Sequence, residues 1–70
     1  MVDSIYRIFI DKRVKHVVKR GRMIFSLRGF RVVVSKMFGF KILKLIKKRS
    51  YSLLRQMIDM YKDEIVTNFS

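Results

Sequence analysis

The chain has no cysteine, proline, tryptophan or alanine, and only five of its 70 residues are acidic. Without cysteine it can form no disulfide, no thiolate metal site and no thiol nucleophile. One histidine and five carboxylates are too few for a zinc site of the usual kind, so we predict no metal and no cofactor. No serine has the base and acid partners of a hydrolase, and the three glycines are too far apart to form a phosphate-binding loop. Catalytic residues are therefore not predicted, and an enzyme is the class that the sequence disfavours most.

Long hydrophobic runs are missing as well. A membrane-spanning helix needs about 20 predominantly apolar residues, and no such run exists, so no membrane span is expected. No signal peptide is expected either, because Arg7 and Asp11 interrupt the apolar start. A hydrophobic content of 50% argues against disorder. Residues 1–70 are therefore predicted to form one small domain, which buries little surface on its own and would benefit from a partner.

Basic charge fills the middle of the chain, and the net charge is +12. All but two of the 17 lysines and arginines lie between Lys12 and Ile58, and no acidic residue does. A surface normally interleaves both signs, and a long stretch of one sign repels itself unless a polyanion neutralises it. Nucleic acids carry closely spaced phosphates that suit this role. We therefore predict contact with nucleic acid, the alternatives being an anionic membrane or an acidic protein.

The hydrophobic pattern predicts both helix and strand. A basic amphipathic helix is predicted over residues 11–25, because apolar side chains recur at near-helical spacing opposite lysines. Alternating β-branched residues predict a strand over Phe30–Ser35, followed by a turn at 36–39. Residues 2–9 are predicted as a short strand or an arm. Residues 40–58 are ambiguous: their periodicity favours helix, but two strands joined by a tight turn are an alternative.

Residues Arg28–Gly39 (R-G-F-R-V-V-V-S-K-M-F-G) resemble the G-[IV]-[KR]-V-x-V-S-G-R-L-x-G segment in the C-terminal domain of small-subunit ribosomal protein S-three. Weaker similarities keep the family's order, with Lys12–Lys15 in the place of a basic helix and Ser52–Asp59 similar to the P-L-H-T-L-x-x-x-I-D-Y segment. The resemblance covers about Lys12–Tyr61. Lys36 stands where the family has glycine, and the family's KH-type domain and last strand have no counterpart.

The resemblance implies an α+β fold in which one basic helix packs on a small sheet, made of a strand and a hairpin over 40–47 and 51–57. Such a unit would be incomplete without partners. The core expected for this arrangement consists of Val14, Val17, Val18, Phe25, Phe30, Val32, Val34, Ile42 and Ile46.

The resemblance also implies a function. The chain would be a reduced or split protein of the small ribosomal subunit, binding ribosomal RNA in the head beside neighbouring ribosomal proteins, with messenger RNA as a further partner. It would not be a homo-oligomer. The absence of proline and alanine, whose codons are GC-rich, suggests an A+T-rich gene, so a mitochondrial ribosome and an organelle-encoded gene are expected.

Basic side chains are the candidate site. The residues predicted to bind RNA phosphates are Lys12, Arg13, Lys15, His16, Lys19, Arg22, Lys36, Lys41, Lys44, Lys47, Lys48 and Arg49. The aromatic residues are predicted to pack in the core or at protein interfaces rather than to stack on bases. Two other functions stay open: a basic amphipathic peptide on a membrane surface, and a small DNA-binding protein of a virus or archaeon.

Overall fold

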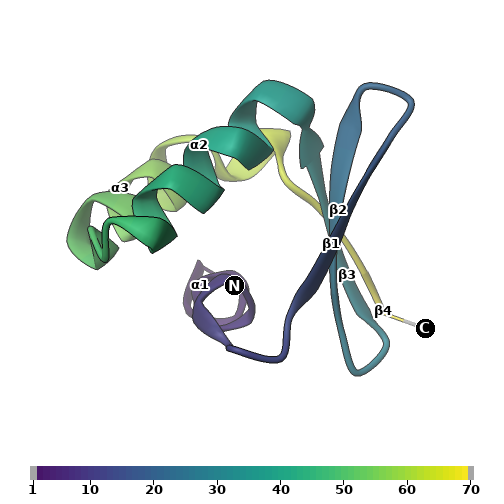
Figure 1. The fold of residues 1–70 in the computed structure, drawn as a ribbon, viewed down its shortest axis with the longest axis horizontal. Coiled ribbons are helices and arrows are strands. Elements are labelled where there is room, and N and C mark those ends of the chain that lie inside the picture. The colour runs from purple at the N-terminus through teal and green to yellow at the C-terminus, as the bar shows by residue number, and fades with distance from the viewer. Residues whose placement is uncertain (1, 70) are drawn as a thin grey trace.

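Three helices lie on one face of a four-stranded antiparallel sheet within residues 2–69, which the computed structural model describes (Figure 1). This is the predicted α+β class. The sheet order is β1-β2-β3-β4, so neighbours in the chain are neighbours in the sheet, and β4 returns to the edge beside β3 after two helices. In chain order the elements are α1 (Val2–Ile10), β1 (Lys15–Lys19), β2 (Arg22–Leu27), β3 (Phe30–Ser35), α2 (Lys36–Lys47), α3 (Tyr51–Met60), a 3-10 turn (Lys62–Glu64) and β4 (Val66–Phe69).

The basic helix predicted over residues 11–25 is wrong, because this segment forms β1 and most of β2. Two-residue turns at Arg20–Gly21 and Arg28–Gly29 join β1 to β2 and β2 to β3. Both residues of each turn have positive φ, 52° and 76° in the first and 50° and 85° in the second, as in type I′ hairpins. Such turns match the twist of the strands they join, so the segment folds as a meander. The strand predicted over Phe30–Ser35 is confirmed as β3.

The hairpin that the resemblance implies over 40–57 is also wrong, and the helical periodicity of this region is confirmed by α2 and α3. The turn predicted at 36–39 is instead the first turn of α2. Ser35 caps that helix, since its hydroxyl accepts a hydrogen bond from the backbone N–H of Phe38 at 3.2 Å. The strand or arm predicted at residues 2–9 is wrong too, because α1 spans these residues.

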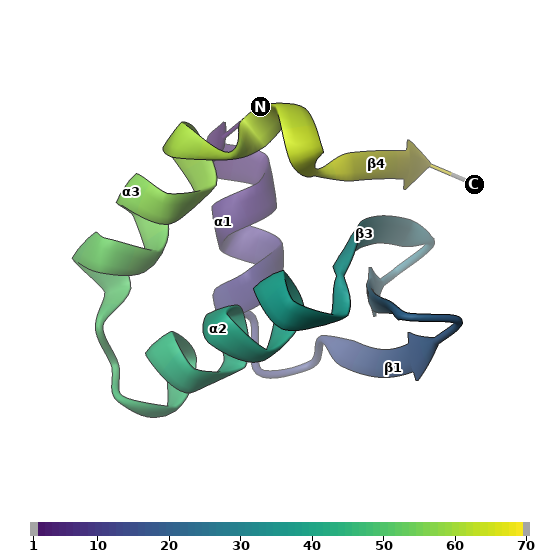
Figure 2. The same cartoon turned by 90° about the horizontal axis from the view of Figure 1, so that it is seen from above.

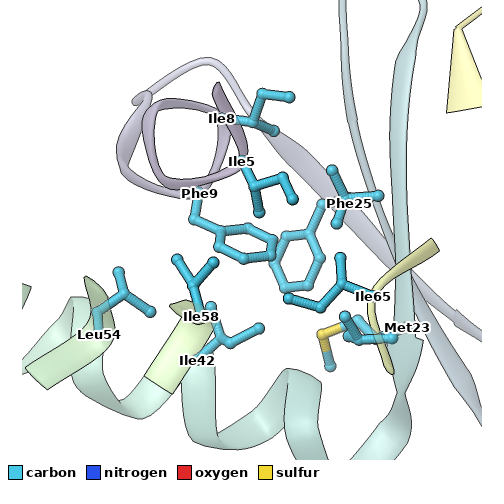
Figure 3. Close-up of a cluster of buried hydrophobic side chains, with 11 residues drawn as sticks. Ile5, Ile8, Phe9, Met23, Phe25, Ile42, Leu54, Ile58 and Ile65 are labelled. Atoms are coloured by element: carbon cyan, nitrogen blue, oxygen red, sulfur yellow. The ribbon is translucent and has the colours of Figure 1, made fainter. Parts of the chain in front are cut away.

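The core lies between the helices and the inner face of the sheet (Figure 3). Phe9 of α1 and Phe25 of β2 meet edge to face at its centre, with ring centroids 4.8 Å apart. Within the described part of the chain the buried apolar side chains are Ile5, Ile8, Phe9, Met23, Phe25, Val32, Val34, Ile42, Leu54, Ile58 and Ile65.

Four of the predicted core residues, Phe25, Val32, Val34 and Ile42, are confirmed as buried. Val14 and Ile46 pack at the margin of the core. Three predictions are wrong, since the exposed fraction is 52% for Val17 and 42% for both Val18 and Phe30. Helices α1 and α3, which the prediction did not place in the core, supply Ile5, Ile8, Phe9, Leu54 and Ile58. The core is therefore larger than the sequence analysis predicted.

Candidate nucleic-acid interface

No described element covers the sheet face that points away from the helices, which we call the outer face (Figure 1). Met23 and Phe25 of β2 are fully buried, so their neighbour Ile24 points outward. The strand register places Val17 opposite Ile24, Ile24 opposite Val33, and Val33 opposite Val66. Directly paired residues share a face, so these four side chains form one continuous line across the sheet. We call this line the apolar row.

Basic residues flank the apolar row on both sides. On one side, Lys19 pairs with Arg22, which pairs with Ser35. On the other side, Lys15 pairs with Ser26, which pairs with Arg31. The two turns add Arg20 and Arg28 at opposite ends of the strands. We call the four cations Lys15, Lys19, Arg22 and Arg31 the basic rows.

The basic rows carry uncompensated charge. Lys19 and Arg22 lie directly opposite each other, and like charges in this position destabilise a sheet. Among residues 2–69, ion pairs join Arg13 to Asp11 and Arg55 to Asp3, and neither pair involves a cation of the basic rows. An anion bound on the outer face would relieve the repulsion between Lys19 and Arg22. The arrangement therefore favours a polyanionic ligand.

The turn arginines occupy a backbone conformation that costs energy. A residue with a Cβ atom loses roughly 1–2 kcal/mol in the left-handed region, and asparagine or aspartate is preferred at the first position of a type I′ turn. Arg20 and Arg28 instead stand at this position in both hairpins, with φ of 52° and 50°. Turn propensity does not explain this choice of residue. Arg20 lines a shallow depression at the edge of the outer face with Arg22 and Val66, whereas Arg28 lines the cavity beside α1, close to Asp11.

Arg13, one of the predicted RNA-binding residues, is already paired. Its guanidinium donates to both carboxylate oxygens of Asp11, at 3.1 and 2.9 Å, and its backbone N–H donates to the same carboxylate at 2.8 Å. These hydrogen bonds from Arg13 lower the pKa of Asp11 to about 2. The carboxylate therefore stays ionised at neutral pH, and it neutralises Arg13 in the loop before β1. Lys12, its neighbour in this loop, is exposed.

The structure divides nine of the twelve predicted binding residues between two surfaces. Lys15, Lys19 and Arg22 belong to the basic rows on the outer face, whereas His16 points to the inner side, with its ring 5.9 Å from that of Phe25. The second surface is the exposed side of α2 and the turn that follows it. It carries Lys36, Lys41, Lys44, Lys47, Lys48 and Arg49.

The α2 surface borders an apolar groove. Lys41, Lys44 and Lys48 lie along the edge of a depression of about 400 Å³ between α2 and α3. Its other lining residues are Leu45, Leu53, Gln56, Met57, Met60 and Tyr61. Helix α2 begins beside the first hairpin, because the backbone N–H of Lys36 donates to the carbonyl of Gly21 at 2.9 Å. From there α2 runs away from the sheet, so its last lysines lie far from the outer face (Figure 2).

Arg31 belongs to the outer face, Arg20 borders it and Arg28 lies beside α1, and none of the three was predicted from the sequence. The signal that could have found them is the pair of Arg-Gly dipeptides at 20–21 and 28–29, eight residues apart and each between runs of strand-forming residues. This spacing indicates a meander of short strands. It also places the two arginines at opposite ends of the hairpins.

Comparisons with protein-family models, with curated proteins and with solved structures find no match for this chain. None of the helices in residues 2–69 has the length and apolar character needed to cross a bilayer. In the same part of the chain no three histidine or acidic side chains lie close enough together to hold a metal ion.

Proposed function

We propose that the chain is a nucleic-acid-binding protein, and that the outer face of its sheet is the binding surface. The observation that carries the proposal is the register of β1, β2 and β3, which gathers Lys15, Lys19, Arg22 and Arg31 on one uncovered face. Each lysine or arginine that neutralises a phosphate releases a condensed counterion, so four such contacts would give strong and salt-dependent binding.

Removing charge from the outer face is the direct test. Substituting Lys15, Lys19 and Arg31 with Gln is expected to weaken nucleic-acid binding by on the order of a hundredfold at 0.1 M salt, because three phosphate contacts are lost. The slope of log affinity against log salt concentration is expected to fall by about 3, at about 0.9 for each phosphate contact. Fluorescence anisotropy with a labelled oligonucleotide measures both quantities.

The matched control removes the same charge from the other surface. The variant K41Q/K44Q/K47Q also loses three positive charges, but on the exposed side of α2. It is expected to bind within a few-fold of the unmodified chain. Equal losses in the two triple variants would contradict the assignment to the outer face, and would show that net charge alone determines binding.

Ribosomal RNA is the specific nucleic acid that the resemblance implies, with the small subunit of a mitochondrial ribosome as the complex. Of the elements that the resemblance implies, the strand over Phe30–Ser35 is present, while the helix before it and the hairpin after it are replaced by a hairpin and two helices. The ribosomal proposal therefore rests on the motif Gly29–Gly39. It predicts that the tagged chain co-sediments with small ribosomal subunits at 0.1 M salt. Recovery of the chain only in ribosome-free fractions would contradict it.

Exposed apolar side chains on α2 and α3 favour a second candidate, contact with an anionic membrane surface. Met37 and Met60 are each 74% exposed, and Phe40 and Leu53 are about half exposed, next to the lysines of α2. Apolar side chains beside lysines suit the boundary between headgroups and acyl chains. Flotation with phosphatidylserine vesicles distinguishes this candidate, because K41Q/K44Q/K47Q would abolish flotation and the outer-face variant would not.

A further inference from the structure

We propose that the outer face binds the major groove of B-form duplex DNA, with the apolar row against the floor of the groove and the basic rows on the phosphates of its two strands. This inference rests on the proposed function, and it adds the class of nucleic acid and the groove. Three features carry it: the spacing of the basic rows, the chemistry of the apolar row, and the residue types that the face lacks.

The spacing of the basic rows suits a β-ribbon that lies along the major groove. The major groove of B-form DNA is about 12 Å wide and admits a two-stranded β-ribbon, and every residue of β1 is exposed, so the β1–β2 ribbon is accessible for insertion. Lys15 and Lys19 are four residues apart on β1, or about 13 Å along the groove at 3.3–3.4 Å per residue, which is about four phosphate spacings of 3.4 Å on one DNA strand. These two lysines can then contact phosphates on the groove edge beside β1, and Arg22 those on the edge beside β2, while Val17 and Ile24 face the floor.

The apolar row determines the chemistry of the DNA surface that it can contact. Val17 and Val66 are 52% and 60% exposed, and Ile24 and Val33 are half-buried. None of these side chains can form a hydrogen bond, so the complementary surface must be apolar as well. The apolar group that a base pair presents in the major groove is the C5-methyl group of thymine. The row therefore favours A·T-rich sequence.

Duplex RNA is a poor fit to the same face. Its major groove is deep and narrow, and its accessible minor groove displays 2′-hydroxyl groups. Valine and isoleucine over these hydroxyls would remove their water and offer no hydrogen bond in return. Uracil also lacks the methyl group that the apolar row would contact.

An unpaired strand is disfavoured because the outer face has no ring on which a base could stack. The described side chains of this face are lysine, arginine, serine, valine and isoleucine. Proteins that bind single strands combine a basic groove with aromatic side chains. In contrast, the rings of Phe9 and Phe25 are buried in the core on the opposite side of the sheet.

A second copy of the chain is disfavoured by charge. Two outer faces packed against each other would bring together the basic rows of both copies, and Glu64, which lines a shallow depression beside Arg22 at one corner of the face, is a single charge against four. Like charges across an interface are strongly unfavourable. The charge of the face therefore complements a polyanion and not another copy.

Thymine methyl groups provide the sharpest test. The full chain is titrated at 0.1 M salt against a 16-base-pair A·T-rich DNA duplex and against the same duplex with every thymine replaced by deoxyuridine. Deoxyuridine removes only the methyl groups, and burial of one such group corresponds to about a fourfold change in affinity. We expect the thymine duplex to bind at least fourfold more tightly. We expect duplex RNA and the single DNA strand of equal length to bind at least tenfold more weakly.

Two substitutions in β1 test which side chain contacts the thymine methyl groups. Val17 and Val18 are adjacent and both exposed, but Val17 belongs to the apolar row and Val18 points to the inner side. Val17→Thr is expected to reduce the preference for thymine over deoxyuridine and to leave the salt slope unchanged. Val18→Thr is expected to alter neither quantity, and it shows whether threonine in this strand impairs folding.

The outcomes separate the two proposals. Equal affinity for the thymine and deoxyuridine duplexes, or equal or tighter binding of duplex RNA or of the single strand, would overturn the major-groove inference and leave nucleic-acid binding intact. A concentration-dependent dimer that buries the outer face and excludes DNA would also overturn it. Failure to bind any of these probes at 0.1 M salt would overturn both proposals.

Discussion

Replacing Gly39 with Ala is expected to lower the melting temperature of the domain by at least 8 °C. Gly39 is buried in α2 where this helix crosses β2, and a Cβ atom built on it would lie 2.6 Å from both the Cβ and the Sδ of Met23. The Cβ of Met23 is held by the strand and cannot move away. A contact this close to an atom fixed by the strand lies at the upper end of overpacking costs, about 3 kcal/mol, and the better helix propensity of alanine returns about 1 kcal/mol.

The net loss of about 2 kcal/mol is large for a domain of this size. A single core below about 70–80 residues rarely supplies more than about 3–5 kcal/mol, and 1 kcal/mol corresponds to about 4–8 °C in melting temperature. Circular dichroism during heating measures the change for the unmodified chain and the variant. Lys44→Ala is the control, because it places alanine at an exposed position of the same helix and should melt within about 2 °C of the unmodified chain. A Gly39→Ala variant that melts like this control would contradict the close contact between α2 and β2.

Replacing Arg20 and Arg28 with Asn is expected to change affinity and stability in opposite directions. Asparagine enters the left-handed region more readily than arginine and is favoured at the first position of type I′ turns. The melting temperature should therefore stay the same or rise by a few degrees. Arg20 lies at the edge of the outer face, whereas Arg28 lies beside Asp11, so the double variant should lose about one phosphate contact. DNA binding should weaken by at least fivefold at 0.1 M salt, and the salt slope should fall by about 1.

Arg49→Asn is the matched control for this double variant. Arg49 also has a positive φ, 57°, but it lies in the turn between α2 and α3, at the end of α2 that is far from the sheet (Figure 2). The substitution removes a charge at the same backbone conformation, so stability should respond as it does at Arg20 and Arg28. Affinity for DNA should change by less than threefold. If R49N weakens binding as much as each turn substitution does, the turns have no special role in the interface.

One strand could be predicted because its local pattern was unambiguous, and two helices were favoured by periodicity although a hairpin stayed an alternative. Alternating β-branched residues identify β3, and the helical period of apolar residues identifies α2 and α3. The resemblance to a ribosomal protein led to a hairpin in place of these helices, so the periodicity was the better guide. For residues 11–25 the local pattern was misleading, because Val14, Val17 and Val18 fit a helical spacing while Met23 and Phe25 fit a strand.

The sequence predicts that the candidate site is basic, but not which basic residues share a surface. The stretch from Lys12 to Ile58, which is basic and contains no acidic residue, indicates a polyanionic partner before any fold is known. It does not separate the cations of the outer face from those of α2, because both groups are equally basic in sequence. It also does not distinguish Arg13, which Asp11 neutralises, from Lys15.

Local residue patterns were enough to identify the mixed α+β class, the third strand and the excess of positive charge, and to favour helix over residues 40–58. Only the folded chain shows that Lys19 lies opposite Arg22, that Val17 continues into Ile24 and Val33, and that Val17 is exposed while Phe25 is buried. The reason is that side-chain alternation specifies only the two faces of each strand. Hydrogen bonds between strands set the register across the sheet, and the packing of α1, α2 and α3 selects which face is covered.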